Sequence, residues 1–173
     1  RMHESRGLGD VYKRQGKGCA GMAQDGERRA ARGLTFEEIE LGMQASVENT
    51  VMDEDIRSLA TVSGDYNPVH LDDEFAKGTP FGNRISHGML TASYISAVFG
   101  MHLPGPGAIY VTQTLNFKRP VWIGDVIRTT VTVAEMFPQK RRVRFECTCR
   151  NAEGKVALEG EAMLMIPGRE AAA

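Results

Sequence analysis

The sequence has no long hydrophobic run, little cysteine and no marked excess of charge. Nowhere do about 18 apolar residues follow one another, which excludes a transmembrane helix. Three cysteines cannot all pair with one another, so a disulfide-stapled secreted domain is not expected. Twenty-one Lys and Arg against 22 Asp and Glu give a net charge of -1, which argues against a general nucleic-acid binder. We therefore expect a cytoplasmic protein with neither a membrane nor a nucleic acid as partner.

Two of the cysteines, Cys147 and Cys149, lie two residues apart on one face of a predicted strand. A zinc site requires about four ligands, and no further His or Cys follows at the usual spacing. We interpret both as thiols of the core. The sequence predicts no metal site and no separate cofactor.

The chain divides into one patterned domain and two tails. Residues 1–33 contain eight Arg or Lys and seven Gly without an apolar period, which predicts a disordered or non-native tail. Residues 34–167 have the pattern of a single domain, and residues 168–173 form a short C-terminal tail. At 42% hydrophobic residues, the domain is large enough to bury a core.

Before residue 83 the pattern predicts a strand, a helix and a turn-rich segment. Residues 45–52 suit a strand, and residues 53–62 suit a helix with Asp53 as N-cap and Gly64 as terminator. Residues 65–82 are rich in turn formers and include a short predicted helix over 72–77.

The stretch between Arg84 and Lys118 contains no Asp, Glu, Lys or Arg. In its first half, residues 88–99, apolar residues fall on every side of a helical wheel. Because a helix without a polar face must be covered by other protein, we expect a fully enclosed helix.

Strands are predicted for residues 108–117, 126–136, 142–150 and 155–166, where apolar and polar residues alternate. Clean alternation indicates antiparallel strands with one buried face. The expected fold class is α+β, with an antiparallel sheet curled around one buried central helix.

Asp65 and His70 are the first candidates for chemistry, because a bend at Asn67-Pro68 allows their side chains to converge. A carboxylate beside an imidazole is an acid/base pair, in which one group takes a proton and the other gives one. The alternative is an Asx-turn with an exposed Asp and a surface His.

The start of the predicted central helix supplies further candidates. Backbone N–H groups there lack intrahelical partners, so the amide of Gly88 can meet an oxyanion, or the glycine is needed only for close packing. His87 is interpreted as a structural histidine, because the helix dipole opposes its protonation. Ser96 either bonds a backbone carbonyl or orients Asp65. The pair Lys118-Arg119 suits phosphate groups at a pocket mouth, or is a solvated strand end.

From residue 34 to 167 the chain resembles the MaoC-like (R)-specific enoyl-CoA hydratases, which have the hotdog fold. Ser63-Gly64-Asp65-Tyr66-Asn67-Pro68-Val69-His70 is similar to the hydratase motif of that family. Further matches are His87-Gly88-Met89-Leu90 and Leu115-Asn116-Phe117-Lys118-Arg119-Pro120-Val121.

The resemblance implies a homodimer with an acyl tunnel beside the central helix. It assigns catalysis to Asp65 and His70, places the Gly88 amide on the thioester carbonyl, and sets Ser96 near the catalytic carboxylate. We assign the substrate contacts to Asn67, Tyr94, Phe99, Lys118 and Arg119, with a bulky Phe99 favouring short acyl chains.

The expected function is hydration of a trans-2-enoyl-CoA to an (R)-3-hydroxyacyl-CoA, or the reverse dehydration, with coenzyme A as part of the substrate. Asp65 would remove a proton from water while His70 delivers a proton toward C2. A hotdog acyl-CoA thioesterase is the alternative, followed by a non-catalytic acyl-thioester binding module.

Overall fold

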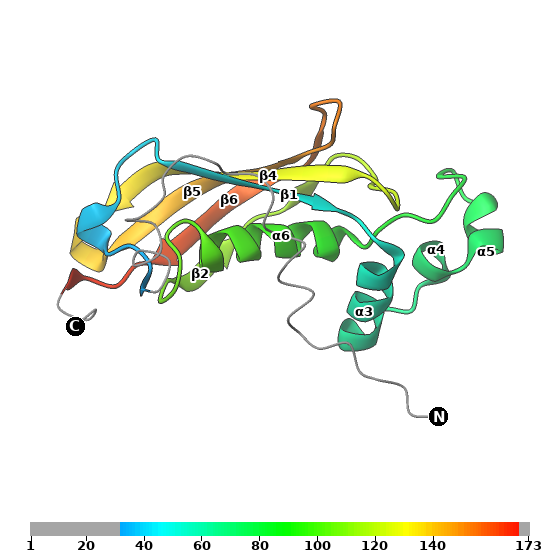
Figure 1. Ribbon diagram of the computed structural model, residues 1–173, viewed down its shortest axis with the longest axis horizontal. Helices are drawn as coiled ribbons and strands as arrows, with labels where there is room; N and C mark the ends of the chain where they lie inside the picture. The colour runs from blue at the N-terminus through cyan, green and yellow to red at the C-terminus, as the bar shows by residue number, and fades with distance from the viewer. Residues whose placement is uncertain (1–31, 170–173) are drawn as a thin grey trace, which may run out of the picture.

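The computed structural model describes residues 32–169, which form one antiparallel sheet with helices on one side and at one end (Figure 1). The sheet order is β1-β4-β5-β6-β2, and the short β3 also pairs with β6. The strands are β1 (Gln44–Thr50), β2 (Ile109–Gln113), β3 (Asn116–Phe117), β4 (Val126–Phe137), β5 (Arg142–Arg150) and β6 (Val156–Met165). This confirms the predicted α+β class.

The central helix α6 (Gly88–Met101) lies along one face of the sheet (Figure 1). Its buried residues, among them Ile95 and Val98, pack on inward-facing strand residues such as Phe145. Cys147 and Cys149 belong to this core, as predicted, and burial raises the pKa of the two thiols to about 12 and about 11.

The prediction of a fully enclosed central helix is wrong for the single chain. One face of α6 is exposed, and its large side chains include Met89 and Met101. The sheet lies on one side of the helix only, and the apolar residues on the other side find no second layer within residues 32–169. Composition showed that the helix is apolar all round but not what covers each side.

Three short helices group together at one end of the sheet: α3 (Asp53–Ser63), α4 (Pro68–Leu71) and α5 (Asp73–Lys77) (Figure 1). Gly64 ends α3 with φ 78°, as predicted. The predicted N-cap is off by one residue, since Met52 is the N-cap of α3. Asp53 instead accepts hydrogen bonds from Arg57 and Arg84, each at 2.7 Å.

The strand predicted over 108–117 is interrupted. β2 ends at Gln113, and the chain leaves the regular ladder before β3 begins at Asn116, although both strands pair with β6. The Thr114 carbonyl lies so close to Gly160 that a Cβ there would be 1.8 Å from the Thr114 oxygen. Only a glycine permits this close approach, and the interruption brings Phe117 to the start of α6.

The remaining elements are two 3-10 turns, η1 (Phe36–Glu38) and η2 (Pro138–Lys140). The tail predicted for residues 1–33 lies outside the described residues except for Arg32 and Gly33, and Gly33 is buried. The second tail is described only at Gly168 and Arg169. Among the described helices, none has the length and apolar character needed to cross a membrane.

Candidate active site

The turn after α3 brings Asp65 toward His70. The left-handed Gly64 reverses the chain, and Asn67 then caps α4 by accepting from the Val69 N–H at 3.2 Å. The Asp65 Oδ1 accepts from the Asn67 N–H at 3.2 Å, which holds the carboxylate over the bend. The resulting Asx-turn and the convergence of Asp65 with His70, offered as alternatives by the sequence, occur together.

The imidazole of His70 is buried, and its tautomer follows from its backbone contact. Its Nδ1 lies 2.8 Å from the carbonyl oxygen of Ile85. A carbonyl only accepts, so Nδ1 carries the hydrogen and Nε2 of the neutral ring is left as an acceptor. Burial, together with the neighbouring His87, lowers the pKa of His70 below its usual 6.5. His70 is therefore ready to take a proton at Nε2.

His87 belongs to the same cluster, which the sequence analysis did not foresee. Its ring packs against the ring of His70 with 3.8 Å between centroids and a tilt of 33°. Its Nε2 lies 3.0 Å from the backbone oxygen of Asp65 and 3.9 Å from the carboxylate Oδ2. In the sequence, His87 stands out only by its place directly before Gly88 at the start of the predicted helix. Its contact with His70 joins segments 17 residues apart and depends on the fold.

A cleft of about 440 Å³ opens beside this cluster at the amino end of α6. Its lining includes His70, Gly88, Phe117, Lys118 and Arg119. The first amides of α6 have no intrahelical acceptor, and the Gly88 N–H has no hydrogen-bond partner within residues 32–169. A Cβ on Gly88 would lie 2.7 Å from Cε1 of Phe117, so the glycine also permits close packing.

Lys118 and Arg119 reach the cleft but already have partners. Lys118 Nζ pairs with Glu159 at 2.9 Å, and Arg119 donates to the Val156 carbonyl at 2.7 Å. Both side chains of the Lys118–Glu159 ion pair are about half exposed, so little free energy is needed for Lys118 to leave Glu159 and bind another anion. Both cations stand on the side of the cleft formed by β6 and the segment after β3.

Five predicted site residues do not line this cleft. One is Asp65, whose carboxylate lies within 4.8 Å of a ring nitrogen of His70, a residue that does line it. Ser96 is exposed on α6 and makes no side-chain hydrogen bond within residues 32–169. Asn67 acts as the cap of α4. Tyr94 is buried with a hydroxyl that lacks a partner, and Phe99 packs edge-on against Phe145 with 4.9 Å between ring centroids. The substrate contacts assigned to Asn67, Tyr94 and Phe99 stay predictions, and so does the role of Ser96 beside the catalytic carboxylate.

One donor atom each of Asp65, His70 and His87 lies within 4.8 Å of the others, which is also the composition of a metal site. One nitrogen of each imidazole bonds a backbone carbonyl, which leaves the other nitrogen free for a proton or a ligand. The free Nδ1 of His87 is buried without a partner. The carboxylate and the imidazole that the sequence predicts to converge, Asp65 and His70, both belong to this cluster.

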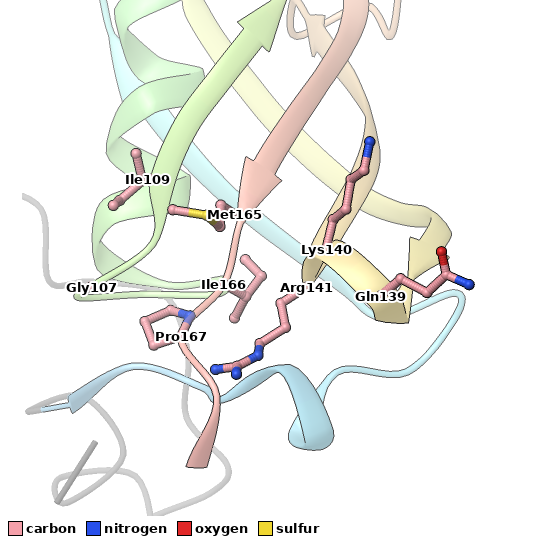
Figure 2. A pocket seen from close by; sticks show the side chains of 8 residues that line it. All are labelled: Gly107, Ile109, Gln139, Lys140, Arg141, Met165, Ile166 and Pro167. Atoms are coloured by element: carbon pink, nitrogen blue, oxygen red, sulfur yellow. The ribbon is translucent and has the colours of Figure 1, made fainter. Parts of the chain in front are cut away.

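A second hollow of about 270 Å³ lies elsewhere, between the start of β2, the end of β6 and η2 (Figure 2). Arg141 and Lys140 flank it, and Ile109, Ile166 and Pro167 supply apolar lining. It contains no acid/base pair. The chemistry therefore concentrates at the amino end of α6.

Comparison with known families decides the classification. Residues 35–154 match the model of the MaoC like domain. The chain belongs to the MaoC-like family. Within it, the chain is 52% identical over 134 residues to the (R)-specific enoyl-CoA hydratase of Rhodospirillum rubrum, covering 78% of this chain and 92% of the relative. It is 48% identical over 141 residues to the 3-hydroxybutyryl-CoA dehydratase of Methylorubrum extorquens, covering 82% of this chain and 89% of the relative.

Solved structures of MaoC-like proteins have the same hotdog fold. The unliganded R-hydratase PhaJ1 from Pseudomonas aeruginosa superposes with a TM-score of 0.76 at 43% identity, covering 79% of this chain and 88% of that chain. The (R)-hydratase from Aeromonas caviae gives a TM-score of 0.74 at 36% identity, covering 76% of this chain and 99% of that chain. The fold and the family resemblance predicted from sequence are thus confirmed.

Proposed function

We propose that this MaoC-like enzyme hydrates trans-2-enoyl-CoA to (R)-3-hydroxyacyl-CoA and catalyses the reverse dehydration. The observation that carries the proposal is the convergence of Asp65 and His70 at the amino end of α6, beside the cleft that Gly88 lines. The relatives named above are a hydratase and a dehydratase, which are carbon–oxygen lyases working on opposite sides of one equilibrium.

Water activation follows from the acceptor atoms of the pair. A carboxylate oxygen of Asp65 and the Nε2 of the His70 ring are both acceptors, so one water can donate a hydrogen to each. The water oxygen attacks C3 of the enoyl group while one of its protons passes to the pair. The π electrons move to the thioester oxygen, and the captured proton is then delivered to C2 from the same pair.

The developing negative charge falls on the thioester oxygen. The Gly88 N–H, unpaired at the positive end of α6, is placed to donate to it. One such donor lowers a barrier by about 3–4 kcal/mol. In this arrangement the thioester lies over Gly88, and the acyl chain extends along the cleft.

Coenzyme A enters as part of the substrate, and its phosphates require cations at the mouth of the cleft. Lys118 and Arg119 line the cleft and supply two such charges. Arg119 is held in place by its bond to the Val156 carbonyl, whereas Lys118 would exchange Glu159 for a phosphate. Loss of either cation is expected to raise KM more than it lowers kcat.

The exposed apolar face supports a homodimer as the working form. It includes Met89 and Met101 on α6 and Ile109 and Val111 on β2. β2 ends the sheet order, so its outer edge has unpaired backbone groups that a second copy can satisfy. Sedimentation analysis is expected to give twice the chain mass, and a monomer at micromolar concentration would contradict this part.

One assay separates the proposed function from its alternatives. With crotonyl-CoA, a hydratase removes the enoyl absorbance without releasing thiol, and chiral analysis shows the (R)-product. A thioesterase releases free coenzyme A, and a binding module changes neither signal. Thiol release that keeps pace with the loss of absorbance would overturn the proposal.

A further inference from the structure

His87 contacts both members of the acid/base pair. Its Nε2 bonds the backbone oxygen of Asp65 at 3.0 Å, and its ring lies against His70 with 3.8 Å between centroids. The peptide bond that follows His87 carries the N–H of Gly88. One side chain therefore touches the two groups proposed to move protons and precedes the amide proposed to hold the oxyanion.

The hydrogen bond to Asp65 defines the state of the His87 ring. The Asp65 carbonyl can only accept, so Nε2 carries the hydrogen. Nδ1 is then an unprotonated acceptor, and it is buried without a partner. The ring therefore acts on Asp65 as a hydrogen-bond donor and on His70 through packing.

The surroundings of the pair explain why it needs such support. Asp65 lies on a turn with 54% of its side chain exposed, and within residues 32–169 its backbone oxygen accepts only from His87. The His70 ring is fixed along one edge by Ile85 and on one face by His87. Without His87, the Asp65 turn would keep only its local hydrogen bonds, and the His70 ring would be held by Ile85 alone.

We propose that His87 is a positioning residue, which holds the Asp65 turn through its Nε2–H and the orientation of His70 through ring stacking. This inference rests on the proposed hydration. The side chain of His87 is only 3% exposed, against 54% for Asp65, so His87 acts through its neighbours and not on the substrate.

Three substitutions separate the two contacts. His87→Phe keeps a ring against His70 and loses the donor, whereas His87→Gln keeps an N–H near the Nε2 position and loses the ring. His87→Ala loses both. We expect kcat with crotonyl-CoA to fall about tenfold in each of the first two and about 100-fold in the third, with KM within about threefold of wild type.

Stability measurements distinguish positioning from a merely structural role. His87→Phe removes an unpaired buried acceptor, and the carbonyl that loses its donor belongs to Asp65, an exposed residue, so the Tm is expected to equal or exceed that of wild type. The matched control is His102→Phe, at the exposed other end of α6, which should change neither kcat nor Tm. Wild-type kcat in His87→Phe and His87→Ala, or a loss of kcat that only follows a lower Tm, would overturn the inference.

A spectroscopic test does not depend on activity. Long-range 1H–15N correlation spectra of histidine-labelled protein at neutral pH should show His87 protonated at Nε2 alone and His70 at Nδ1 alone. In His87→Ala, the His70 ring signals should shift and broaden, because the ring loses its stacking partner while the bond to Ile85 keeps the hydrogen on Nδ1. Unchanged His70 signals there, or a His87 protonated at Nδ1, would refute the inference. Wild-type protein that leaves crotonyl-CoA untouched would instead refute the proposed function.

Discussion

Changing Asp65 to Asn removes one charge from the site and almost nothing from the fold. The Asn67 N–H bonds Oδ1 of Asp65, and an amide oxygen accepts that bond equally well. The new NH2 group takes the place of Oδ2, the oxygen 3.9 Å from His87 Nε2. An acceptor for water thus becomes a donor, and the side chain no longer takes a proton.

The size of the effect follows from these contacts. An acid/base group contributes about 10²–10⁴ in rate, so kcat should fall by that factor, or about 3–5 kcal/mol of barrier. Because the Asp65 side chain is 54% exposed, its exchange should change the free energy of unfolding by no more than about 0.5 kcal/mol. That corresponds to a Tm shift of about 1–2 °C in a domain of this size.

The assay is the initial rate of loss of the enoyl absorbance of crotonyl-CoA, with Tm measured on the same samples. Asp72→Asn is the matched control, since Asp72 caps α5 through bonds to the Glu74 and Phe75 amides and Asn caps equally well. Its rate should stay within about twofold of wild type. An Asp65→Asn enzyme with more than a tenth of wild-type kcat would refute the assigned role.

Four further outcomes are expected. Gly88→Ala keeps the amide N–H, but its Cβ must displace the exposed ring of Phe117 at the cleft and so shifts the bound thioester. We expect kcat/KM to fall roughly 100-fold, while thermal melting shows a loss of stability of no more than about 1 kcal/mol; a loss of stability as large as the rise in the barrier would indicate packing alone. Tyr94→Phe removes an unpaired buried hydroxyl, and an unchanged or higher Tm is expected. Folding lowers the pKa of His70, so the unfolded chain binds the proton first as the pH falls below 6.5. The free energy of unfolding, measured with denaturant, should therefore decrease as the pH falls from 6.5 through the pKa of His70 in the folded protein, and it should decrease less steeply in His70→Asn. Arg84→Ala breaks two ion pairs of a nearly buried guanidinium, and denaturant unfolding should show a loss of about 2 kcal/mol.

Much of the site could be predicted from the sequence, because it depends on local backbone preferences. Asn67-Pro68 predicts a bend whatever surrounds it, because the proline ring restricts its own φ and disfavours a helical conformation for the preceding residue. The bend is present, and Asp65 and His70 meet across it. Gly88 was identifiable because an uncharged apolar segment begins at that residue and a helix start leaves free amides.

The role of His87 was not readable in the same way. Its position before the central helix is evident from the sequence, yet its contacts join three segments: the turn at Asp65, the end of α4 at His70 and the start of α6. Tyr94 and Phe99 are on the central helix as predicted. Both are buried in the core and do not line the described cleft, so the substrate contacts assigned to them stay predictions.

The sequence by itself determined the class of fold, the order of the elements and the residue types available for acid/base chemistry, since these follow from periodicity and local backbone preference. Only the tertiary structure decided which side of α6 is covered, where the strand after residue 113 breaks, and which ring packs on His70. Such contacts arise when distant segments share one core, and their geometry depends on the packing of the whole domain.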